Sequence, residues 1–312
     1  MRSLKHLQPA NWHIELNETL YNAQITRTNP SALLFMIDQS ASMGFGTQPY
    51  KGEMKTAAQI VADMINDMLN EIITRCMKAE GIRDYFDVCI LGYGSTNNTE
   101  ANILWEGNLK GKEWVSLSEL KANAMYENRE VVKKNRGVEK KIRLDFPFWL
   151  KPVAKYGTPM GAAFEKAHSL LCEWIKKDGH ENSYPPVVIN ITDGGQTDCQ
   201  ANFLIEGAQK VQALNTRDGQ VLVLNCHISN NSNSILFPLK KEELPSDSYA
   251  MSLFEMSSIM PNIFNADMAN IRNDADIFSD YRGMGFNVNM NALFNMIDIG
   301  TTGATKQITG RK

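Results

Sequence analysis

Continuous apolar runs along the chain predict strands that are buried on both faces. Between Ala32 and Ile37 every residue is apolar, and the run ends abruptly at Asp38. Runs without polar residues at alternate positions are typical of parallel strands covered by helices on both sides. The long runs lie at 31–38, 85–93, 185–193 and 221–228, with short strands expected at 102–105 and near 262–265.

Between these runs, apolar residues recur every three or four positions, which is the period of a helix with one buried face. The clearest such pattern begins at Met54 and stops at Gly81, and a second one follows Pro159. Strands that alternate with helices favour a parallel sheet. The sequence therefore predicts an α/β fold with a doubly wound, mostly parallel sheet and helices on both faces. Further helices are expected at about 200–215, 248–260 and 288–298.

A polar and charged segment at about 107–150 interrupts this alternation. It holds a weak helical pattern at 117–126 and a basic run at 129–143, which we interpret as a solvated hairpin, with a docking arm as the alternative. We expect one domain over 31–299 with this segment inserted. The lead-in 1–30 is expected to pack on the domain, and the tail 300–312 to fray.

Composition excludes several classes of function. A net charge of −3 and a pI near 6.0 give no general attraction to nucleic acid or to anionic lipid. No run approaches the roughly 20 apolar residues of a membrane span, and the first nine residues lack the apolar core of a signal peptide. Five scattered cysteines without Cys-x-x-Cys spacing indicate neither a disulfide framework nor a zinc site. We therefore expect a cytoplasmic protein.

The candidate chemistry begins where the first strand ends. Asp38, Ser40 and Ser42 offer one carboxylate and two hydroxyls at alternate positions of one loop. Oxygen ligands of this kind suit a hard cation such as Mg²⁺, with Mn²⁺ as a substitute.

This Asp-x-Ser-x-Ser loop resembles the metal-ion-dependent adhesion site of von Willebrand factor A domains. Gly157-Thr158-Pro159 and Thr192-Asp193-Gly194 follow in the order expected for that family, whereas Ala41 stands where the family usually has Gly. The resemblance implies that two serines and a threonine contact the metal and that two aspartates lie close by, often through water. The implied metal set is Asp38, Ser40, Ser42, Thr158 and Asp193.

Topology explains how residues so far apart in sequence could meet. In a doubly wound sheet of order 3-2-1-4-5-6, strands one and four are neighbours, and ligands bind outside their carboxyl ends. Asp38 ends the first strand and Asp193 the fourth, while Thr158 precedes a helix at the same edge. The alternative is that both aspartates only cap helices and satisfy loops.

The resemblance implies a non-catalytic module that binds a protein partner, whose acidic side chain completes the coordination of Mg²⁺. Cytoplasmic bacterial members of the family are typically adaptors in signalling, stress or defence complexes. A Mg²⁺-dependent hydrolase or phosphatase is a competing class. Against it, Ser40 stands where a haloacid dehalogenase-type enzyme needs a second Asp, and no Gly-x-Ser-x-Gly turn accompanies His227. A scaffold with a purely structural metal is the third class.

Overall fold

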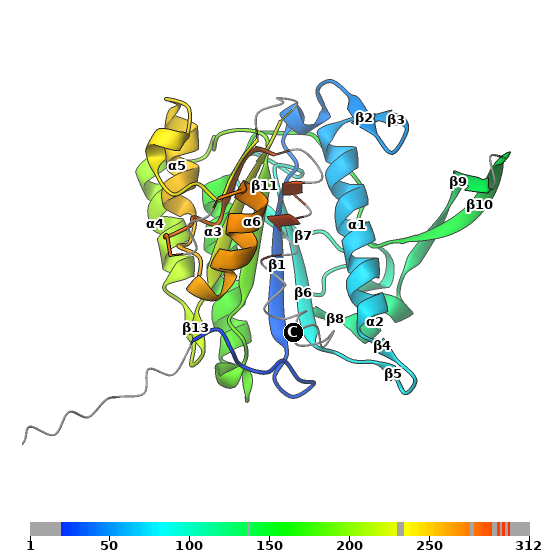
Figure 1. The fold of residues 1–312 in the computed structure, drawn as a ribbon, viewed down its shortest axis with the longest axis horizontal. Helices are drawn as coiled ribbons and strands as arrows, with labels where there is room; N and C mark the ends of the chain where they lie inside the picture. Colours follow the sequence, from blue (N-terminus) through cyan, green and yellow to red (C-terminus); the bar gives the residue numbers. More distant parts are fainter. Residues whose placement is uncertain are drawn as a thin grey trace, which may run out of the picture.

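Eight strands form one central sheet with helices on both faces (Figure 1). The computed structural model describes residues 20–135, 138–229, 234–274, 278–288, 292, 293, 295, 296 and 299. The sheet order is β15-β16-β14-β11-β1-β6-β7, and β8 also pairs with β6. Counted along the chain, β7, β6, β1, β11, β14 and β16 reproduce the predicted order 3-2-1-4-5-6, so the predicted fold class is confirmed.

The five central strands run parallel, and the edges of the sheet are antiparallel. The apolar runs form the strands because both faces are covered by helices. The central strands are β1 (Ser31–Asp38), β6 (Phe86–Tyr93), β11 (Val187–Thr192), β14 (Leu222–Ile228) and β16 (Met284–Val288). The edge strands are β7 (Ala101–Ile103), β8 (Val115–Ser116) and β15 (Ile235–Leu236).

The prediction of the last parallel strand was wrong. Residues Asn262–Phe264 form a 3-10 turn, η5, and the strand is β16, some twenty residues later. Gly285 and Asn287 interrupt the apolar pattern of β16, and both residue types are depleted in strands. Neighbouring β14 nevertheless recruits this segment, because its free edge needs a hydrogen-bonding partner. The helix predicted at 288–298 falls mostly outside the described residues.

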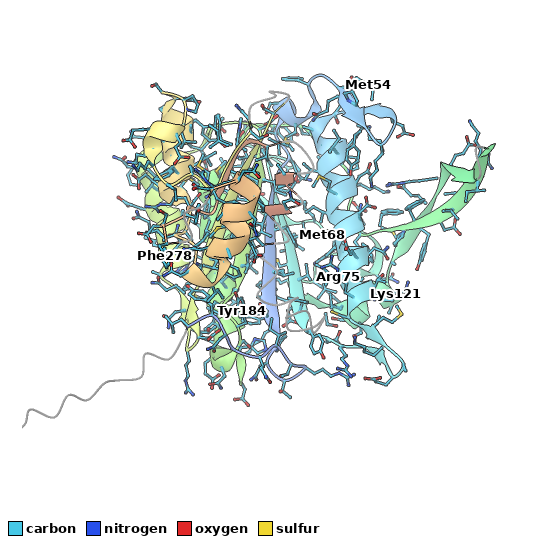
Figure 2. All side chains as sticks on the ribbon, viewed as in Figure 1. Met54, Met68, Arg75, Lys121, Tyr184 and Phe278 are labelled. Atoms are coloured by element: carbon cyan, nitrogen blue, oxygen red, sulfur yellow. The ribbon has the colours of Figure 1, made fainter. Side chains whose placement is uncertain are left out.

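The first long helix begins later than its apolar pattern suggests. Thr56 accepts a hydrogen bond from the Gln59 backbone, and the Gln59 side chain accepts one from the Thr56 backbone, so this capping box starts α1 at Ala57. Met54 instead lies exposed in the preceding hairpin of β2 (Gln48–Tyr50) and β3 (Glu53–Lys55), while Met68, a residue of α1 (Ala57–Arg75), is buried (Figure 2). One face of the sheet is covered by α1, α2 and α6, and the other by α3, α4 and α5.

The remaining elements are short or cover the sheet. The helices are α1 (Ala57–Arg75), α2 (Leu117–Ala122), α3 (Met160–Ile175), α4 (Ala201–Gln212), α5 (Ser248–Met256) and α6 (Asn265–Arg272). The 3-10 turns are η1 (Ala41–Gly44), η2 (Gly107–Leu109), η3 (His180–Asn182), η4 (Lys241–Glu243) and η5 (Asn262–Phe264). The small hairpins pair β2 (Gln48–Tyr50) with β3 (Glu53–Lys55), β4 (Met77–Lys78) with β5 (Gly81–Ile82), and β12 (Asn215–Thr216) with β13 (Gly219–Gln220).

The inserted segment divides into two parts. Its first part joins the body, since β8 pairs with β6 and α2 packs in the core. The basic run forms the expected hairpin of β9 (Met125–Asn135) and β10 (Val138–Phe148), which projects away from the body (Figure 1). We call this hairpin the arm. In the lead-in, Ile25 is buried in the core, as expected for a segment that packs on the domain. Residues 1–19 of the lead-in and the tail 300–312 lie outside the described residues.

A chain of buried polar side chains crosses the sheet beneath its carboxyl edge. The Tyr93 hydroxyl donates to Asn190 Oδ1 at 2.8 Å, and Asn190 Nδ2 donates to Asn225 Oδ1 at 3.0 Å. Asn225 Nδ2 in turn donates to the Ser257 hydroxyl at 3.1 Å. All four residues are fully buried, so each hydrogen bond replaces one that water would otherwise make.

Replacing the central amide should therefore be costly. Asn190→Ala leaves the Tyr93 hydroxyl and the Asn225 carbonyl without their partner, and we expect a loss of about 2–4 kcal/mol in the free energy of unfolding. Urea denaturation measures this loss. Asn108→Ala, at an exposed position of η2, is the matched control and should change the value by less than about 0.5 kcal/mol. An equally small effect of both substitutions would contradict the role of the chain.

Candidate metal centre

Two of the predicted loops meet because β1 and β11 are adjacent parallel strands. Ile37 lies opposite Ile191, which brings Asp38 level with Thr192 and sets Asp193 just beyond the sheet. Hydrogen bonds join the two loops. The Thr192 hydroxyl donates to Asp38 Oδ2 at 2.7 Å, and the Ser42 hydroxyl donates to Asp193 Oδ1 at 2.8 Å.

The hydroxyls of the first loop lie beside these carboxylates. Ser40 Oγ and Ser42 Oγ are 3.0 Å apart, and the Ser40 backbone N–H donates to Asp38 Oδ1 at 2.8 Å. Asp38 and Ser40 are buried, whereas Ser42 and Asp193 are partly open to solvent. Four of the five predicted residues thus form one hydrogen-bonded cluster that has a wet side.

Thr158 is the fifth predicted residue, and the backbone brings it to the same edge. The Tyr156 carbonyl accepts a hydrogen bond from the Ala41 backbone at 2.8 Å, so the threonine loop runs alongside the serine loop. The Thr158 backbone N–H donates to the Thr197 hydroxyl at 2.8 Å. Within the described part of the chain, the Thr158 hydroxyl itself has no hydrogen-bond partner, although the residue is buried. It is therefore available to a ligand.

Gly94 makes this close approach of the loops possible. Its φ is +91°, and a Cβ at this position would lie 2.3 Å from the Gly157 carbonyl oxygen and 3.1 Å from the Ser40 backbone nitrogen. Only glycine accepts both that conformation and that contact. Ala41, by contrast, has no positive φ and begins η1, so alanine fits where the family usually has glycine.

Burial sets the electrostatics of the two carboxylates. Loss of water raises the pKa of Asp38 to about 6, although its hydrogen bonds from Ser40 and Thr192 oppose the shift. Asp193 also has a raised pKa, again chiefly because it is desolvated. Two desolvated carboxylates side by side favour a bound cation, which would compensate for both charges.

Thr192 and His227, near the cluster, have structural roles that the motifs alone did not assign. Thr192 belongs to the Thr-Asp-Gly motif, yet its function is to hold Asp38, and the Tyr249 hydroxyl lies 3.3 Å from its Oγ1. His227 lies opposite Thr192 and stacks on Phe286 at 4.5 Å. Its Nδ1 accepts the Asn287 backbone N–H, and burial lowers the pKa of its imidazole. His227 is therefore a packed residue with a structural partner, as expected from the sequence.

The donor set fits Mg²⁺ or Mn²⁺. Among the described residues, no group of three or more His, Cys, Asp or Glu side chains could hold a metal ion, so a cation at this edge depends on hydroxyl oxygens as well. The cluster supplies two carboxylates and three hydroxyls, the hard oxygen ligands that these cations prefer. The Thr158 hydroxyl, which has no hydrogen-bond partner among the described residues, is free to act as one of these ligands.

Comparisons with known proteins concern the fold. No family model matches the chain, and no curated protein matches it either. Solved structures that it resembles include a von Willebrand factor type A structure from Catenulispora acidiphila, at 12% identity and a TM-score of 0.35, with 65% of this chain and 34% of that chain covered. Another is an aerotolerance-related membrane protein from Bacteroides fragilis, at 11% identity and a TM-score of 0.39, with 90% and 100% covered.

A third similar structure is the vWF domain of the type V pili tip protein Mfa5 from Porphyromonas gingivalis, at 12% identity and a TM-score of 0.26, with 53% of this chain and 38% of that chain covered. The chain thus spans about a third of the first of these proteins. The sheet order and the order of the three motifs are those expected from the resemblance to von Willebrand factor A domains. No described helix is long and apolar enough to cross a membrane.

A methyl group at Gly94 should separate the two loops. Gly94→Ala is expected to lower the free energy of unfolding in urea by about 1–3 kcal/mol more than Gly46→Ala does. Gly46 is the matched control, because its φ is also positive, at +67°, while its added Cβ would meet nothing within 4 Å. Equal losses for the two variants would show that the contact with Gly157 is unimportant.

Asp38 should make apo-protein stability depend on pH. Its pKa is about 6 in the fold against an ordinary 3.8, so the folded state holds the proton more tightly. The protonated acid therefore stabilises the fold below pH 3.8, and this contribution, about 3 kcal/mol, is lost as the pH rises through about 6. In EDTA, Asp38→Asn should exceed wild type in unfolding free energy at about pH 7.5 and converge with it towards pH 4.5.

Chemical denaturation across this pH range measures the difference. Asp178→Asn, which removes an exposed carboxylate, is the matched control and should follow wild type at every pH. A pH-independent gap between Asp38→Asn and wild type would contradict the raised pKa.

Proposed function

We propose that this chain is a non-catalytic, divalent-metal-dependent protein-interaction module. The observation that supports it best is the meeting of three loops at the carboxyl edge, where Asp38, Ser40, Ser42 and Asp193 form one hydrogen-bonded cluster and the loop of Thr158 runs alongside. Asp38 and Asp193 would balance the charge of Mg²⁺, and Ser40, Ser42 and Thr158 would hold it. When bound, the ion supplies a positive centre to which a carboxylate of a partner protein can bind.

The surroundings of the cluster favour a partner over a purely structural metal. Phe45, directly after η1, is 76% exposed, and Tyr156, two residues before Thr158, is 48% exposed. Exposed aromatic side chains next to a polar site are typical of protein interfaces. Lys155 adds a positive charge on the same loop and suits an acidic partner. A purely structural metal would not account for the exposure of Phe45 and Tyr156 beside the site, whereas a protein partner would cover both.

Hydrolysis receives no specific support. A hydrolase needs a general base within reach of the reacting water, and the histidine at this edge is His227, whose Nδ1 is taken by the Asn287 backbone. We therefore infer an adaptor rather than an enzyme, acting in a bacterial signalling, stress or defence complex and binding neither nucleic acid nor membrane.

Thr158 offers the sharpest test of metal binding. Since its hydroxyl has no partner in the described chain, Thr158→Val should leave the apo melting temperature almost unchanged while weakening Mg²⁺ binding. A tenfold weaker affinity reduces the stabilisation by Mg²⁺ at 100 times the dissociation constant from about 2.7 to about 1.4 kcal/mol. Thermal unfolding with and without MgCl₂ measures it, and Thr96→Val on the neighbouring loop is the control. An equal response to Mg²⁺ in both variants would contradict the assignment.

A pull-down from native cell extract tests the interaction. We expect a partner that is retained in Mg²⁺, released by EDTA, and lost with Asp38→Ala and Thr158→Ala. A partner retained equally under all these conditions would place binding elsewhere and leave the metal with a structural role. Turnover of phosphate or ester substrates that requires Asp38 would replace the module with an enzyme.

A further inference from the structure

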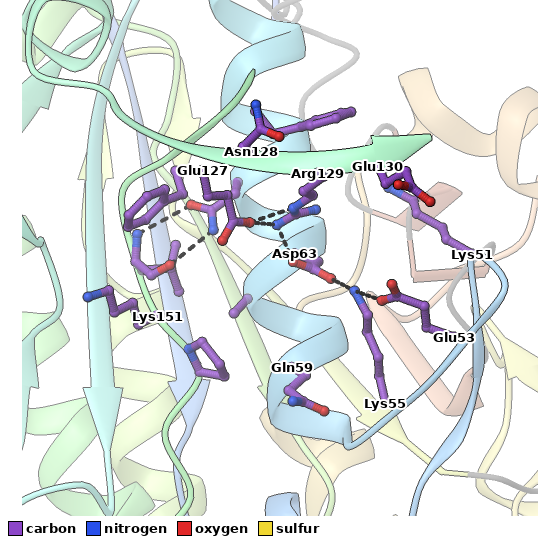
Figure 3. A pocket seen from close by; sticks show the side chains of 16 residues that line it. Lys51, Glu53, Lys55, Gln59, Asp63, Glu127, Asn128, Arg129, Glu130 and Lys151 are labelled. Carbon is purple, nitrogen blue, oxygen red and sulfur yellow. Dashed lines mark hydrogen bonds and ion pairs between the residues drawn. The ribbon is translucent and has the colours of Figure 1, made fainter. Parts of the chain in front are cut away.

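A large cavity lies away from the metal centre. It has a volume of about 550 Å³ and is bounded by the β2–β3 hairpin, by α1 and by the base of the arm (Figure 3). We call it the arm cleft. Its lining mixes charged side chains with an apolar floor that includes Phe146, Phe148 and Leu150. This volume lies within the range of ligand sites in proteins.

The arm presents an amphipathic face to this cleft. Four apolar residues occupy alternate positions of β10, namely Ile142, Leu144, Phe146 and Phe148, and alternate residues of a strand share one face. Phe146 and Phe148 line the cleft, whereas Leu144 lies further out along the arm and is 39% exposed. The opposite face carries Tyr126 and Pro147 beside Asn128, which donates to Asp145 at 3.0 Å. The apolar stripe therefore continues beyond the part that α1 covers.

A two-stranded hairpin is marginally stable in water when nothing covers its apolar face. A part-buried ion pair holds the arm against α1, since Asp63 of α1 accepts from Arg129 Nη2 of the arm at 2.7 Å. Asp63 also accepts from Lys55 Nζ of the β2–β3 hairpin at 2.7 Å. Arg129 belongs to the arm and lies over the Phe146 ring at 5.4 Å. The base of the arm is thus fixed, and its outer stripe is presented to solvent in a defined orientation.

The charges that line the cleft are paired, with one exception. Lys55 also binds Glu53 at 3.0 Å, Arg129 binds Glu127, Lys51 binds Asp67, and Glu130 binds Lys141 at 2.7 Å. Lys151 has no carboxylate partner among the described residues, and its Nζ lies 5.9 Å from the centre of the Phe148 ring. Figure 3 shows it apart from the chain of ion pairs. The cleft therefore offers one available cation next to an apolar floor.

The cleft is linked to the metal centre by the segment between Lys151 and Lys155. Lys155 donates its backbone N–H to the Gln39 carbonyl at 2.9 Å, beside Asp38. Four residues span at most about 14 Å, which an extended peptide of four or five residues also spans. One partner could therefore occupy both places.

We propose that the arm cleft is a second docking site, which binds a segment of the partner protein carrying an acidic side chain beside apolar ones. The carboxylate pairs with Lys151, and the apolar side chains cover Phe146, Phe148 and Leu144. The proposal rests on the proposed function only in one respect, namely that the same partner protein binds at the cleft and at the metal centre. The charge of Lys151 and the exposed Leu144 at the outer end of the stripe select this chemistry.

The test uses a phage-displayed library of random 12-residue peptides, panned on the full chain in EDTA so that no metal takes part. We expect enriched peptides to combine Asp or Glu with aromatic or branched apolar residues. Fluorescence anisotropy of the best peptide should then show a dissociation constant raised roughly fivefold or more by Lys151→Glu. Leu144→Ser should raise it by about fivefold.

Two further measurements sharpen the result. Panning on Lys151→Glu should enrich basic instead of acidic peptides, a reversal that general loss of structure would not produce. Tyr126→Ser is the matched control for Leu144→Ser, because Tyr126 is another exposed apolar residue of the arm and pairs with Pro147 on the opposite face. It should leave the dissociation constant within about twofold.

Contrary outcomes are distinct from failure of the metal module. The docking proposal would be wrong if no peptide were enriched. It would also be wrong if neither Lys151→Glu nor Leu144→Ser changed the dissociation constant of the best peptide. Neither result would bear on Mg²⁺-dependent capture of a partner. A dimer that Leu144→Ser dissociates in sedimentation velocity would assign the stripe to a second copy of the chain and overturn the proposal as well. Loss of Mg²⁺-dependent capture with intact peptide binding in EDTA would reject the metal module alone.

Discussion

The parallel register of β1 with β11 is the constraint on which the rest of the molecule depends. It brings Asp38 level with Thr192, and the 2.7 Å hydrogen bond between Thr192 Oγ1 and Asp38 Oδ2 fixes the carboxylate inside the sheet edge. Asp193 follows immediately and reaches Ser42. If β11 were shifted by one residue against β1, every side chain of β11 would turn to the other face of the sheet, and the hydrogen bonds of the cluster would be lost.

The same arrangement lowers the stability of the fold in the absence of a cation, because it removes water from two carboxylates. Burial raises the pKa of Asp38 to about 6, so at neutral pH the fold holds an ionised carboxylate in a place where water has been removed. Gly94 permits the loops to pack this tightly, because any side chain there would strike Gly157. Tight packing and desolvation would strengthen the attraction for a cation, and the binding of the proposed Mg²⁺ would offset the stability lost in the apo state.

The arm extends the functional surface without disturbing this centre. Its two strands pair with each other and not with the central sheet, and its base is held to α1 through the ion pair of Asp63 with Arg129. The segment from Lys151 to Lys155 leads from the arm cleft to the loop beside Asp38. The two proposed recognition sites, one for a metal-bound carboxylate and one for an acidic and apolar segment, would thus lie within reach of a single partner.

Apolar periodicity in the sequence predicted the alternation of strands and helices, because periodicity is a local property. The five oxygen-bearing residues followed from the resemblance of three short motifs to von Willebrand factor A domains, and the structure confirms the sheet order expected for a doubly wound fold. The sequence did not determine β16, whose Gly285 and Asn287 become a strand only through pairing with β14, nor the start of α1, which a side-chain cap sets. Only the tertiary structure decided that Thr192 holds Asp38, that a Cβ at Gly94 would meet the Gly157 carbonyl, and that Lys151 lines the arm cleft without a described carboxylate partner. These features depend on contacts between distant segments, whose distances no local pattern encodes.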